Sequence, residues 1–434
     1  MRPILFGLLL PLIPGCAREA SPHPDVLFVI VDTLRRDHLS SYGYRGHPTS
    51  PALDRLASEG VTFSGLSASS SWTKPSVATL FSGQEPFQHR VIRLFDVFEA
   101  APTLAETFQG NGYVTACVQA NFLLQRVWQG RATGFARGFR FYDDAIAARP
   151  DPHRGSTAAE VADRALAWLG DHGGGDPWFL VLHFFDPHVA YEDHADLSFG
   201  DSAYQGWVKG GLERSVLHRH QGSCTEADRA QLSAFYDEEI RAADDALGRV
   251  LDRLRRSPRW KNTLVVFTAD HGEELAERGY IGHTVSLHSE LVDLPLVVRL
   301  PGGLRAGTRI AARVPEKDLF PTTLDLCGLP VPPENGHSFA SFLRGKEAPY
   351  DRNLFSEVDF QPANPEYREK YTFQRSVTAE GFKLIADLKS RQKLLFDLEA
   401  DPGERSNRYG DPALAALQGR LEDLLTHHPW FRHP

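Results

Sequence analysis

Apolar runs that alternate with helical patterns constrain the fold of this chain more than any other feature of its sequence. Residues 26–31 form a continuous apolar, β-branched run, which is typical of a strand buried on both faces. Similar runs cover residues 113–118, 178–184, 263–268 and 294–300, and helical patterns between the runs cover residues 51–59, 103–109, 156–169 and 225–256. This alternation predicts an α/β fold, with a mostly parallel central sheet flanked by helices on both faces.

Three polar residues lie at the ends of these predicted strands. Asp32 directly follows the first run, His183 lies near the end of the run over residues 178–184, and Asp270 lies just beyond the run over residues 263–268. In open parallel sheets, ligands bind beyond the carboxyl ends of the strands. We therefore expect the three side chains to converge on one crevice.

The sequence changes character beyond residue 330. A proline-rich connection over residues 329–335 leads to short strand-like pieces at residues 382–385 and 393–396, and a helical pattern over residues 412–425 ends the chain. We predict a large α/β domain over residues 25–330. The remaining residues, 331–434, are predicted to form a small α+β subdomain with an antiparallel sheet packed by the last helix.

The first residues resemble an export signal. Arg2 precedes a short apolar run over residues 4–13, which is too short to span a bilayer. The ending Ile-Pro-Gly-Cys looks like a bacterial lipobox, so residues 1–16 are predicted to be a lipoprotein-type signal peptide and residues 17–24 a linker. A lipidated Cys16 would tether an exported protein to the bacterial cell envelope. An ordinary signal peptide, with a periplasmic or extracellular product, is the alternative.

Composition and cysteine spacing exclude several classes of protein. The net charge of -9 provides no basic face for nucleic acid. The three cysteines beyond the signal are Cys117, Cys224 and Cys327, which are far apart and show no C-x-x-C spacing. The sequence therefore indicates neither a zinc cluster nor a disulfide scaffold, although one disulfide is possible.

Six short motifs carry a family resemblance. They are VDTLR at residues 31–35, YGY at 42–44, SWTKPSVATL at 71–80, FDPH at 185–188, YDEEI at 236–240 and DHGEE at 270–274. In this order they resemble a sulfatase-like member of the alkaline phosphatase superfamily. The segment DPGE at residues 401–404, with the strand-like pieces before it, is similar to the C-terminal subdomain of sulfatases.

The third motif departs from the sulfatase signature. In that family a cysteine or serine opens a C/S-x-P-S-R run and is oxidised to formylglycine, which the arginine supports. Here Thr73 and Val77 occupy those two positions. Threonine cannot be converted because its β-carbon already carries a methyl group, so no formylglycine is expected. Thr73 resembles the nucleophile of the phosphoethanolamine and glycerophosphate transferases of the same superfamily. A helix N-cap is the alternative role for Thr73.

The resemblance to these transferases also implies a metal set. It consists of Asp32, Thr73, Asp270 and His271, which would suit one divalent ion. Mn²⁺, Mg²⁺ or Zn²⁺ is favoured over Ca²⁺, because Thr33 replaces the second acid of the sulfatase motif. From the residues alone, Asp32 could instead cap a turn, and the Asp-His pair could form hydrogen bonds within a loop.

Five further residues are candidates for contacts with a substrate. In the family, histidines at the positions of His188 and His283 face the ester or its leaving group, so the resemblance implies substrate binding or proton transfer for both. Lys74 adjoins Thr73 and could neutralise a bound anion. Asn121 follows the strand predicted at residues 113–118 and could donate a hydrogen bond. His183 is assigned to the substrate site or to its support.

These observations favour an exported, metal-dependent ester hydrolase or transferase that cleaves a phosphoester through Thr73. The substrate would be a phosphorylated or sulfated small molecule, lipid or glycan, recognised by the loops over residues 132–154 and 193–223. A sulfatase that works without formylglycine is the first alternative. Val77 and the absence of a lysine after Gly282 count against it, because two sulfate-binding cations are then missing. An inactive family member that binds a glycan or envelope partner is the second alternative.

Overall fold

The computed structural model of the protein describes residues 23–99, 102–151, 153, 155–172, 175–194, 196–346, 352–362 and 371–430. The predicted signal peptide, and the linker as far as residue 22, lie outside the described residues. Within these ranges, none of the helices combines the length and the apolar character that a membrane span requires.

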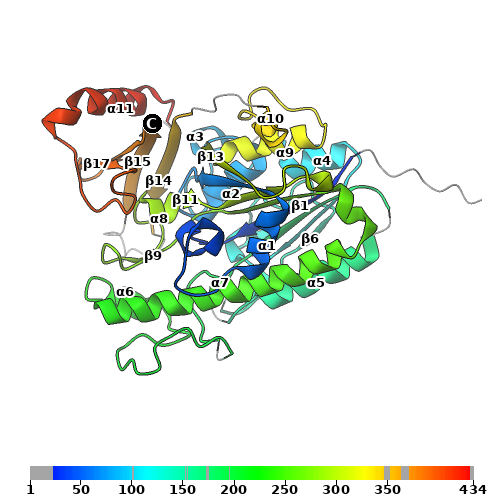
Figure 1. Ribbon diagram of the computed structural model, residues 1–434, viewed down its shortest axis with the longest axis horizontal. Coiled ribbons are helices and arrows are strands. Elements are labelled where there is room, and N and C mark those ends of the chain that lie inside the picture. The colour runs from blue at the N-terminus through cyan, green and yellow to red at the C-terminus, as the bar shows by residue number, and fades with distance from the viewer. Residues whose placement is uncertain are drawn as a thin grey trace, which may run out of the picture.

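A nine-stranded sheet forms the centre of the molecule (Figure 1). Its strands are β1 Asp25–Val31, β2 Val61–Ser67, β3 Val114–Gln119, β6 Phe141–Asp143, β7 Trp178–Phe184, β8 Thr263–Ala269, β11 Asp293–Leu294, β12 Leu296–Arg299 and β13 Thr308–Pro315. The order is β11-β2-β12-β8-β1-β7-β3-β6, and β13 pairs with β2. The strands from β8 to β6 run parallel, and β1 is buried along its whole length between β8 and β7. The predicted mostly parallel sheet is thus confirmed.

Helices cover both faces of this sheet, as predicted (Figure 1). One layer contains α1 Pro51–Glu59, α5 Ala158–His172 and α7 Glu226–Arg255, and the opposite layer contains α2 Thr73–Ser82, α4 Leu104–Gly110 and α9 Leu319–Leu326. Shorter helices are α3 Pro86–His89, α6 Arg214–His220, α8 Ser289–Val292 and α10 Ala340–Leu343, and two small hairpins pair β4 Val127–Trp128 with β5 Arg131–Ala132 and β9 Glu274–Leu275 with β10 Ile281–Gly282. Reciprocal capping by Thr103 and Thr225 fixes the starts of α4 and α7.

The structure differs from the prediction at one edge of the sheet. Residues 294–300 were expected to form one strand, but Pro295 separates β11 from β12, and both strands run antiparallel to β2. Proline has no N–H to donate to a strand ladder, which explains the break. Strands β2, β6 and β13 are absent from the prediction. Serine and glycine interrupt the apolar pattern of β2, and β13 carries Arg309, which is exposed, and Arg313, which is partly exposed.

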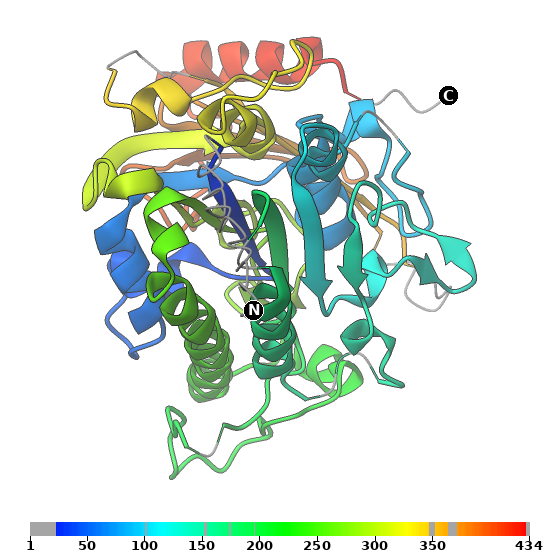
Figure 2. The ribbon, with the colours of Figure 1, turned by 90° about the vertical axis from the view of Figure 1, so that its right-hand side faces the viewer.

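The C-terminal region forms the predicted small antiparallel sheet. Its strands are β14 Leu354–Phe360, β15 Thr372–Ala379, β16 Phe382–Asp387 and β17 Lys393–Asp397, in that order. Helix α11, Ala415–His427, lies across the sheet, and their contact encloses a small separate core (Figure 2). Helix α10 packs on α9 of the large domain. The domain boundary at residue 330 remains a prediction.

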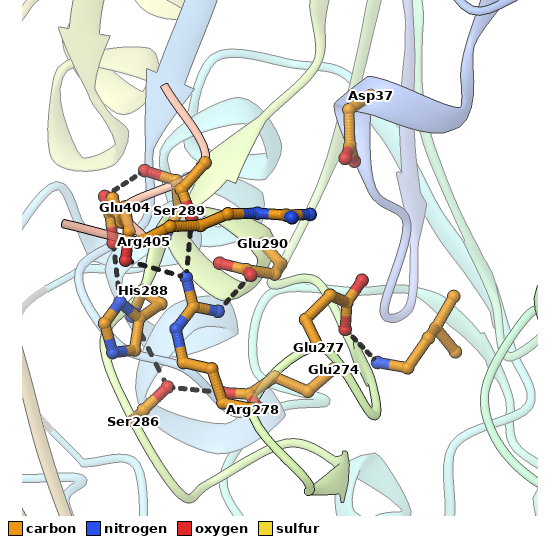
Figure 3. A network of polar contacts seen from close by, with 12 residues as sticks. Asp37, Glu274, Glu277, Arg278, Ser286, His288, Ser289, Glu290, Glu404 and Arg405 are labelled. Carbon is orange, nitrogen blue, oxygen red and sulfur yellow. Dashed lines mark hydrogen bonds and ion pairs between the residues drawn. The ribbon is translucent and has the colours of Figure 1, made fainter. Parts of the chain in front are cut away.

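A buried carboxylate joins the two parts of the chain (Figure 3). Glu404 accepts a hydrogen bond from the backbone N–H of Ser289, and its Oε2 lies 2.7 Å from Nδ1 of His288. Lys383, on β16, forms an ion pair with the same carboxylate at 3.0 Å. Burial opposes ionisation, but the charge of Lys383 and the hydrogen bond with His288 hold the pKa of Glu404 well below its usual value. The ionised form is therefore the one that stabilises the fold.

We expect Glu404→Gln to lower the free energy of unfolding at neutral pH by about 3–5 kcal/mol, because it leaves Lys383 buried without its counter-charge. Since the folded pKa is depressed, this contribution is present above the unfolded pKa of about 4.3 and is lost as the pH falls towards the folded value. Urea unfolding at neutral and at acidic pH measures the difference. Glu422→Gln is the matched control, because its partner Lys393 is partly exposed and the loss should stay below about 1 kcal/mol. Equal losses in the two variants would contradict the prediction.

Candidate active site

The carboxyl edge of the sheet brings the predicted polar residues together. Asp32 directly follows β1, and Asp270 follows the neighbouring strand β8. On the other side of β1, His183 in β7 is in register with Ile30. Asn121 lies two residues beyond β3, the next strand along. Because these four strands are adjacent and parallel, their side chains meet at one edge.

Two carboxylates and two imidazoles form the innermost cluster. Nε2 of His271 lies 3.5 Å from Oδ1 of Asp32 and 3.7 Å from Oδ2 of Asp270. From the other side, Nε2 of His183 lies 4.0 Å from Oδ2 of Asp32 and 3.7 Å from Oδ2 of Asp270. All four side chains are buried. Asp32, His183 and Asp270 form a candidate metal site, with ligand atoms within 4.8 Å of one another.

The polar atoms of this cluster fit a divalent cation. Oδ1 of Asp32, Oδ2 of Asp270 and both ring nitrogens of His183 are buried without a hydrogen-bond partner. Burial and the negative charge of Asp270 raise the pKa of Asp32 well above its usual value. Two buried carboxylates at this separation are costly unless a cation lies between them. Carboxylate oxygens with imidazole nitrogens are donors that Mn²⁺, Mg²⁺ and Zn²⁺ accept.

Thr73 is the first residue of α2. The N-cap residue is Trp72, and no side chain caps the helix, so the hydroxyl of Thr73 is not the predicted alternative N-cap. Its Oγ1 lies 3.3 Å from Nε2 of His271 and accepts from Nδ2 of Asn121 at 3.3 Å. The N-terminus of α2 adds backbone N–H groups and a positive dipole end, which favour a bound anion.

Neighbouring groups fix the rings and amides around Thr73. Nδ1 of His271 donates to the carbonyl of Gly272 at 2.9 Å, which turns Nε2 towards Thr73 and the carboxylates. Oδ1 of Asn121 accepts from the N–H of Leu123 at 2.8 Å, and its Nδ2 donates to Oδ2 of Asp32 at 2.6 Å. Both side chains are therefore oriented before any substrate binds.

A buried glutamate supports the segment that carries Thr73. Glu316, which follows β13, accepts a hydrogen bond from the N–H of Ser69 at 2.8 Å and lies 2.8 Å from Oγ of Ser76. The Ser76 hydroxyl also donates to the carbonyl of Asp270 at 2.5 Å. A hydroxyl has one proton, so both contacts are full hydrogen bonds only when Glu316 is protonated and donates to Ser76; otherwise the two acceptors share the Ser76 proton. Burial raises the pKa of Glu316 well above its usual value, which favours the protonated form.

His188 and His283 lie beside Thr73 in a pocket of about 200 Å³. Nδ1 of His188 donates to the carbonyl of Val189 at 2.6 Å, and Nδ1 of His283 lies 2.8 Å from Oε1 of Glu273. The two rings are 5.0 Å apart, and His283 is 4.5 Å from His271. Burial and neighbouring positive charge hold the pKa of both His188 and His283 well below the usual value. Both rings are therefore neutral at pH 7.

The same pocket contains residues that the sequence did not single out. They are Arg214 on α6, His153, Phe360 on β14 and the aromatic side chains Phe122 and Trp128. The loops that hold His153 and Arg214 were predicted to recognise the substrate, but no motif marked these two residues. Phe360 brings the C-terminal subdomain to the pocket, where its ring meets Trp72 edge-on at 5.4 Å.

Two residues that were predicted to contact the substrate, Lys74 and His183, do not line this pocket. Nζ of Lys74 donates to the carbonyls of Leu94 at 2.8 Å and Asp96 at 2.5 Å, and its side chain does not line the pocket. Burial lowers the pKa of Lys74 to about 8. Its contacts fit a role in holding residues 94–96 rather than a substrate. His183 lies with the carboxylates, behind the pocket, because its strand position points it towards them.

Comparison with known proteins identifies the family. The sulfatase family model matches residues 24–329, and a model described as N-sulphoglucosamine sulphohydrolase, C-terminal, matches residues 277–429. Similar curated proteins include a Delta 4,5-hexuronate-2-O-sulfatase from Bacteroides thetaiotaomicron, 27% identical over 95% of this chain and 91% of the relative. The multifunctional alkaline phosphatase superfamily protein PehA from Trinickia caryophylli is 26% identical over 91% of this chain and 92% of its own.

Solved structures share the fold. A phosphonate monoester hydrolase from Silicibacter pomeroyi superposes with a TM-score of 0.76 at 23% identity, covering 93% of this chain and 95% of its own. A 2-O GAG sulfatase superposes with a TM-score of 0.73 at 22% identity. The match covers 93% of this chain and 91% of the sulfatase chain. The family match covers most of the large domain and all of the cluster around Thr73. The chain is therefore an ester hydrolase of the sulfatase family, within the alkaline phosphatase superfamily.

Proposed function

We propose that this protein is a metal-dependent hydrolase or phosphotransferase that cleaves a phosphoester through Thr73. The position of the Thr73 hydroxyl carries the proposal. Its oxygen lies at the start of α2, within 3.3 Å of His271 and of Asn121, and these two residues also contact Asp32. A hydroxyl held at a carboxylate and imidazole cluster, at a helix N-terminus, is well placed to attack an anionic ester.

The proposed reaction has two displacement steps. In the first, a bond forms between Oγ1 of Thr73 and phosphorus while the bond from phosphorus to the leaving oxygen breaks. The unprotonated Nε2 of His188 takes the Thr73 proton and returns it to the leaving oxygen. In the second step, the oxygen of water or of an alcohol acceptor bonds to phosphorus while the bond from phosphorus to Oγ1 of Thr73 breaks. The proton that the attacking oxygen loses passes to Oγ1. A divalent ion held by Asp32, His183, Asp270 and His271 would stabilise the developing charge on both oxygens.

The charges of the site favour a singly charged ester. Arg214 is the one side chain with a full charge among the described residues that line the pocket. The two carboxylates of Asp32 and Asp270 would balance a divalent ion, and a second negative charge on the ester would find no further cationic side chain among the described residues that line the pocket. A phosphodiester or a phosphonate monoester carries one negative charge, whereas a phosphate monoester carries two near neutral pH.

A sulfate ester is the alternative substrate, since it also carries one charge. Several relatives are named as sulfatases. Two solved structures with the same fold are named as phosphonate monoester hydrolases. Val77 is buried in α2, where the sulfatase signature has an arginine. Thr73 cannot become formylglycine, and Val77 removes a cation that would bind sulfate. Both differences favour a phosphoester substrate over a sulfate ester.

Turnover of three esters with the same leaving group tests the proposal. The metal-loaded protein is assayed with bis(p-nitrophenyl) phosphate, p-nitrophenyl phosphate and p-nitrophenyl sulfate. We expect the diester to give a kcat/KM about tenfold or more above that of the phosphate monoester, because one charge difference at a partly buried site is worth over 1 kcal/mol. It should also exceed that of the sulfate, because buried Val77 replaces the arginine of the sulfatase signature. Turnover of the sulfate alone would establish a sulfatase without formylglycine. No turnover of any ester would support a binding role.

Glu316 should affect the rate without contacting the substrate. Glu316→Ala removes the donor to Ser76 and the acceptor for Ser69, so we expect kcat to fall about 10–100-fold as Thr73 loses its fixed position. Glu316→Gln keeps one acceptor and one donor, as the protonated carboxyl does, and should restore kcat to within a few-fold of wild type. Steady-state kinetics of both variants measures the difference. Equal kcat values for the two variants would contradict the positioning role.

Export and the lipid tether on Cys16 remain predictions. Globomycin treatment of a bacterial host, followed by a mobility shift of the full-length protein, would test lipoprotein processing.

A further inference from the structure

One motif of the sequence has no part in the proposed reaction. It is YDEEI at residues 236–240, within α7, and it contains the consecutive acids Asp237, Glu238 and Glu239, which are at most 2% exposed. A buried carboxylate is costly unless hydrogen bonds replace its contacts with water. Asp237 has two histidines from the segment between β1 and α1 as partners. The partners of the other two acids lie in the connection between β7 and α7, residues 185–225.

Both glutamates hold this connection by its backbone. The carboxylate of Glu238 accepts from the N–H groups of His194 at 3.0 Å and Phe199 at 2.6 Å. Oε1 of Glu239 accepts from the N–H of Glu192 at 2.7 Å and lies 3.1 Å from Nε2 of His194. The motif therefore attaches the first part of the connection to α7.

The bond from Glu239 holds a segment that lies against the returning part of the connection. The carbonyl of Tyr191 accepts from the N–H of Gly211 at 2.7 Å. A Cβ on Gly210 would lie only 2.4 Å from Cβ of Asp193, so the two segments approach as closely as glycine allows. Arg214, the first residue of α6, follows this contact and lines the active-site pocket. Its position therefore depends on the segment that Glu239 holds.

Glu192 extends the same attachment to a second pocket residue. Its Oε1 accepts from the N–H of Gly155 at 2.8 Å, and the N–H of Ala190 donates to the carbonyl of His153 at 3.2 Å. His153 lines the pocket, where its ring stacks on that of His188 at 5.2 Å. One side chain of α7 is thus linked, through Glu192, to two segments that carry pocket residues.

We propose that Glu239 is a positioning residue, which fixes Arg214 and His153 in the pocket through Glu192. Glu239 does not line the pocket itself. The proposal rests on the proposed function for the role of Arg214 beside an anionic ester. It goes beyond that function, because it assigns part of the anion affinity to a residue outside the pocket.

The geometry of hydrogen bonds gives the physical reason for the expected effect. A hydrogen bond from a guanidinium to an anion is strong because it is charge-assisted, but it weakens steeply when its angle falls towards about 120°. A displacement of about 1 Å at the start of α6 is therefore enough to weaken the contact of Arg214 with a bound ester. Loss of the acceptor for the N–H of Glu192 removes the bond that prevents this displacement.

A double-mutant cycle tests the coupling without any turnover. Glu239→Met keeps a long side chain but offers no oxygen to the N–H of Glu192, and Arg214→Gln removes the charge in the pocket. Isothermal titration calorimetry of the metal-loaded protein measures the affinity of wild type, both single variants and the double variant for dimethyl phosphate. This diester carries one negative charge and has no activated leaving group.

Two variants on α7 serve as controls. Glu239→Gln keeps an oxygen that can accept from the N–H of Glu192. Gln231→Met is the matched control, because Gln231 is also buried and its Oε1 accepts from the N–H of Asp201 at 2.9 Å, further along the same connection. Both variants should bind dimethyl phosphate within about twofold of wild type.

We expect Arg214→Gln to weaken the binding of dimethyl phosphate about tenfold or more, and Glu239→Met to weaken it by a similar factor. The double variant should lose at most about twofold beyond the weaker single variant, because both changes remove the same contact. Additive losses would overturn the proposal, and so would unchanged affinity in Glu239→Met. An equal loss in Gln231→Met would show general loosening of the connection instead of a positioning role for Glu239.

Hydrogen exchange of the metal-free protein gives a second test, at a position that is partly exposed. Glu192→Ala removes the acceptor for Gly155 but keeps the N–H that Glu239 binds. Exchange at residues 155–157 should become faster, while the affinity for dimethyl phosphate falls less than in Glu239→Met. Unchanged exchange would refute the link through Glu192.

The outcome for the positioning role is separate from the outcome for the reaction. Coupling between Glu239 and Arg214 in a protein that turns over no ester would leave the positioning role standing and refute the proposed reaction. Turnover of the diester with additive losses would do the reverse. Equal binding of dimethyl phosphate by wild type and Arg214→Gln, or no binding by wild type, would show that Arg214 does not hold the anion and would overturn the positioning role.

Discussion

Thr73→Ala should abolish phosphoester turnover and the covalent intermediate together. The substitution removes the attacking oxygen, and we expect kcat for bis(p-nitrophenyl) phosphate to fall by about 10⁴-fold or more, as when a nucleophile is removed from other covalent enzymes. Wild-type protein quenched in acid during turnover should gain the mass of one p-nitrophenyl phosphoryl group, located on Thr73 by peptide mass spectrometry. The variant should show no adduct.

Two further variants make this result specific. Thr73→Ser keeps a hydroxyl at the start of α2 and should retain both the adduct and a reduced rate. Thr426→Ala makes the same chemical change on exposed α11, where the hydroxyl donates to the carbonyl of Glu422, and should leave the rate unchanged. An adduct-free wild type with full turnover would mean that water attacks the ester directly. Turnover by Thr73→Ala at the wild-type rate would also exclude a threonine nucleophile.

Asp270→Asn should weaken metal binding and also lower the stability of the metal-free protein. The asparagine oxygen can still accept from the N–H groups of Thr33 and His271, which now bond to Oδ1. Loss of the charge should weaken metal affinity by more than about 100-fold, because even supporting residues of metal sites contribute 10–100-fold. Without metal, His271 and His183 hold the pKa of Asp270 below its usual value despite burial, so loss of this charge should lower the free energy of unfolding by about 1–3 kcal/mol.

Metal content after dialysis and urea unfolding in a chelator measure these two effects. Asp244→Asn is the matched control, because Asp244 is also buried but accepts from the N–H groups of Ala52 and Leu53 at the start of α1, away from the cluster. It should leave the metal content unchanged. If Asp270→Asn bound metal as wild type does, the cluster would not be the metal site. If its metal-free form were more stable, repulsion from Asp32 would outweigh the contacts of Asp270 with the two histidines.

Local sequence patterns predicted the central strands and the long helices. Continuous apolar runs marked β1, β3, β7 and β8, because strands buried on both faces tolerate few polar residues. Pro51–Glu59 has the predicted bounds, and the helical patterns that begin at residues 103 and 225 placed the starts of α4 and α7 within one residue. The antiparallel edge was missed, because β11 and β12 are too short to show a period of their own.

The sequence by itself determined the fold class and the residues that could meet at the carboxyl edge of the sheet. Asp32, Asp270 and His183 lie at or near the carboxyl ends of parallel strands. The backbone alone therefore places them at that edge, independently of side-chain conformation. Only the tertiary structure decided which groups share a pocket. It turned Lys74 towards the carbonyls of residues 94 and 96, and it brought Arg214 and Phe360 beside Thr73. The physical reason is that strand periodicity is a local property, whereas the contacts of a loop residue depend on the packing of segments far apart in the chain.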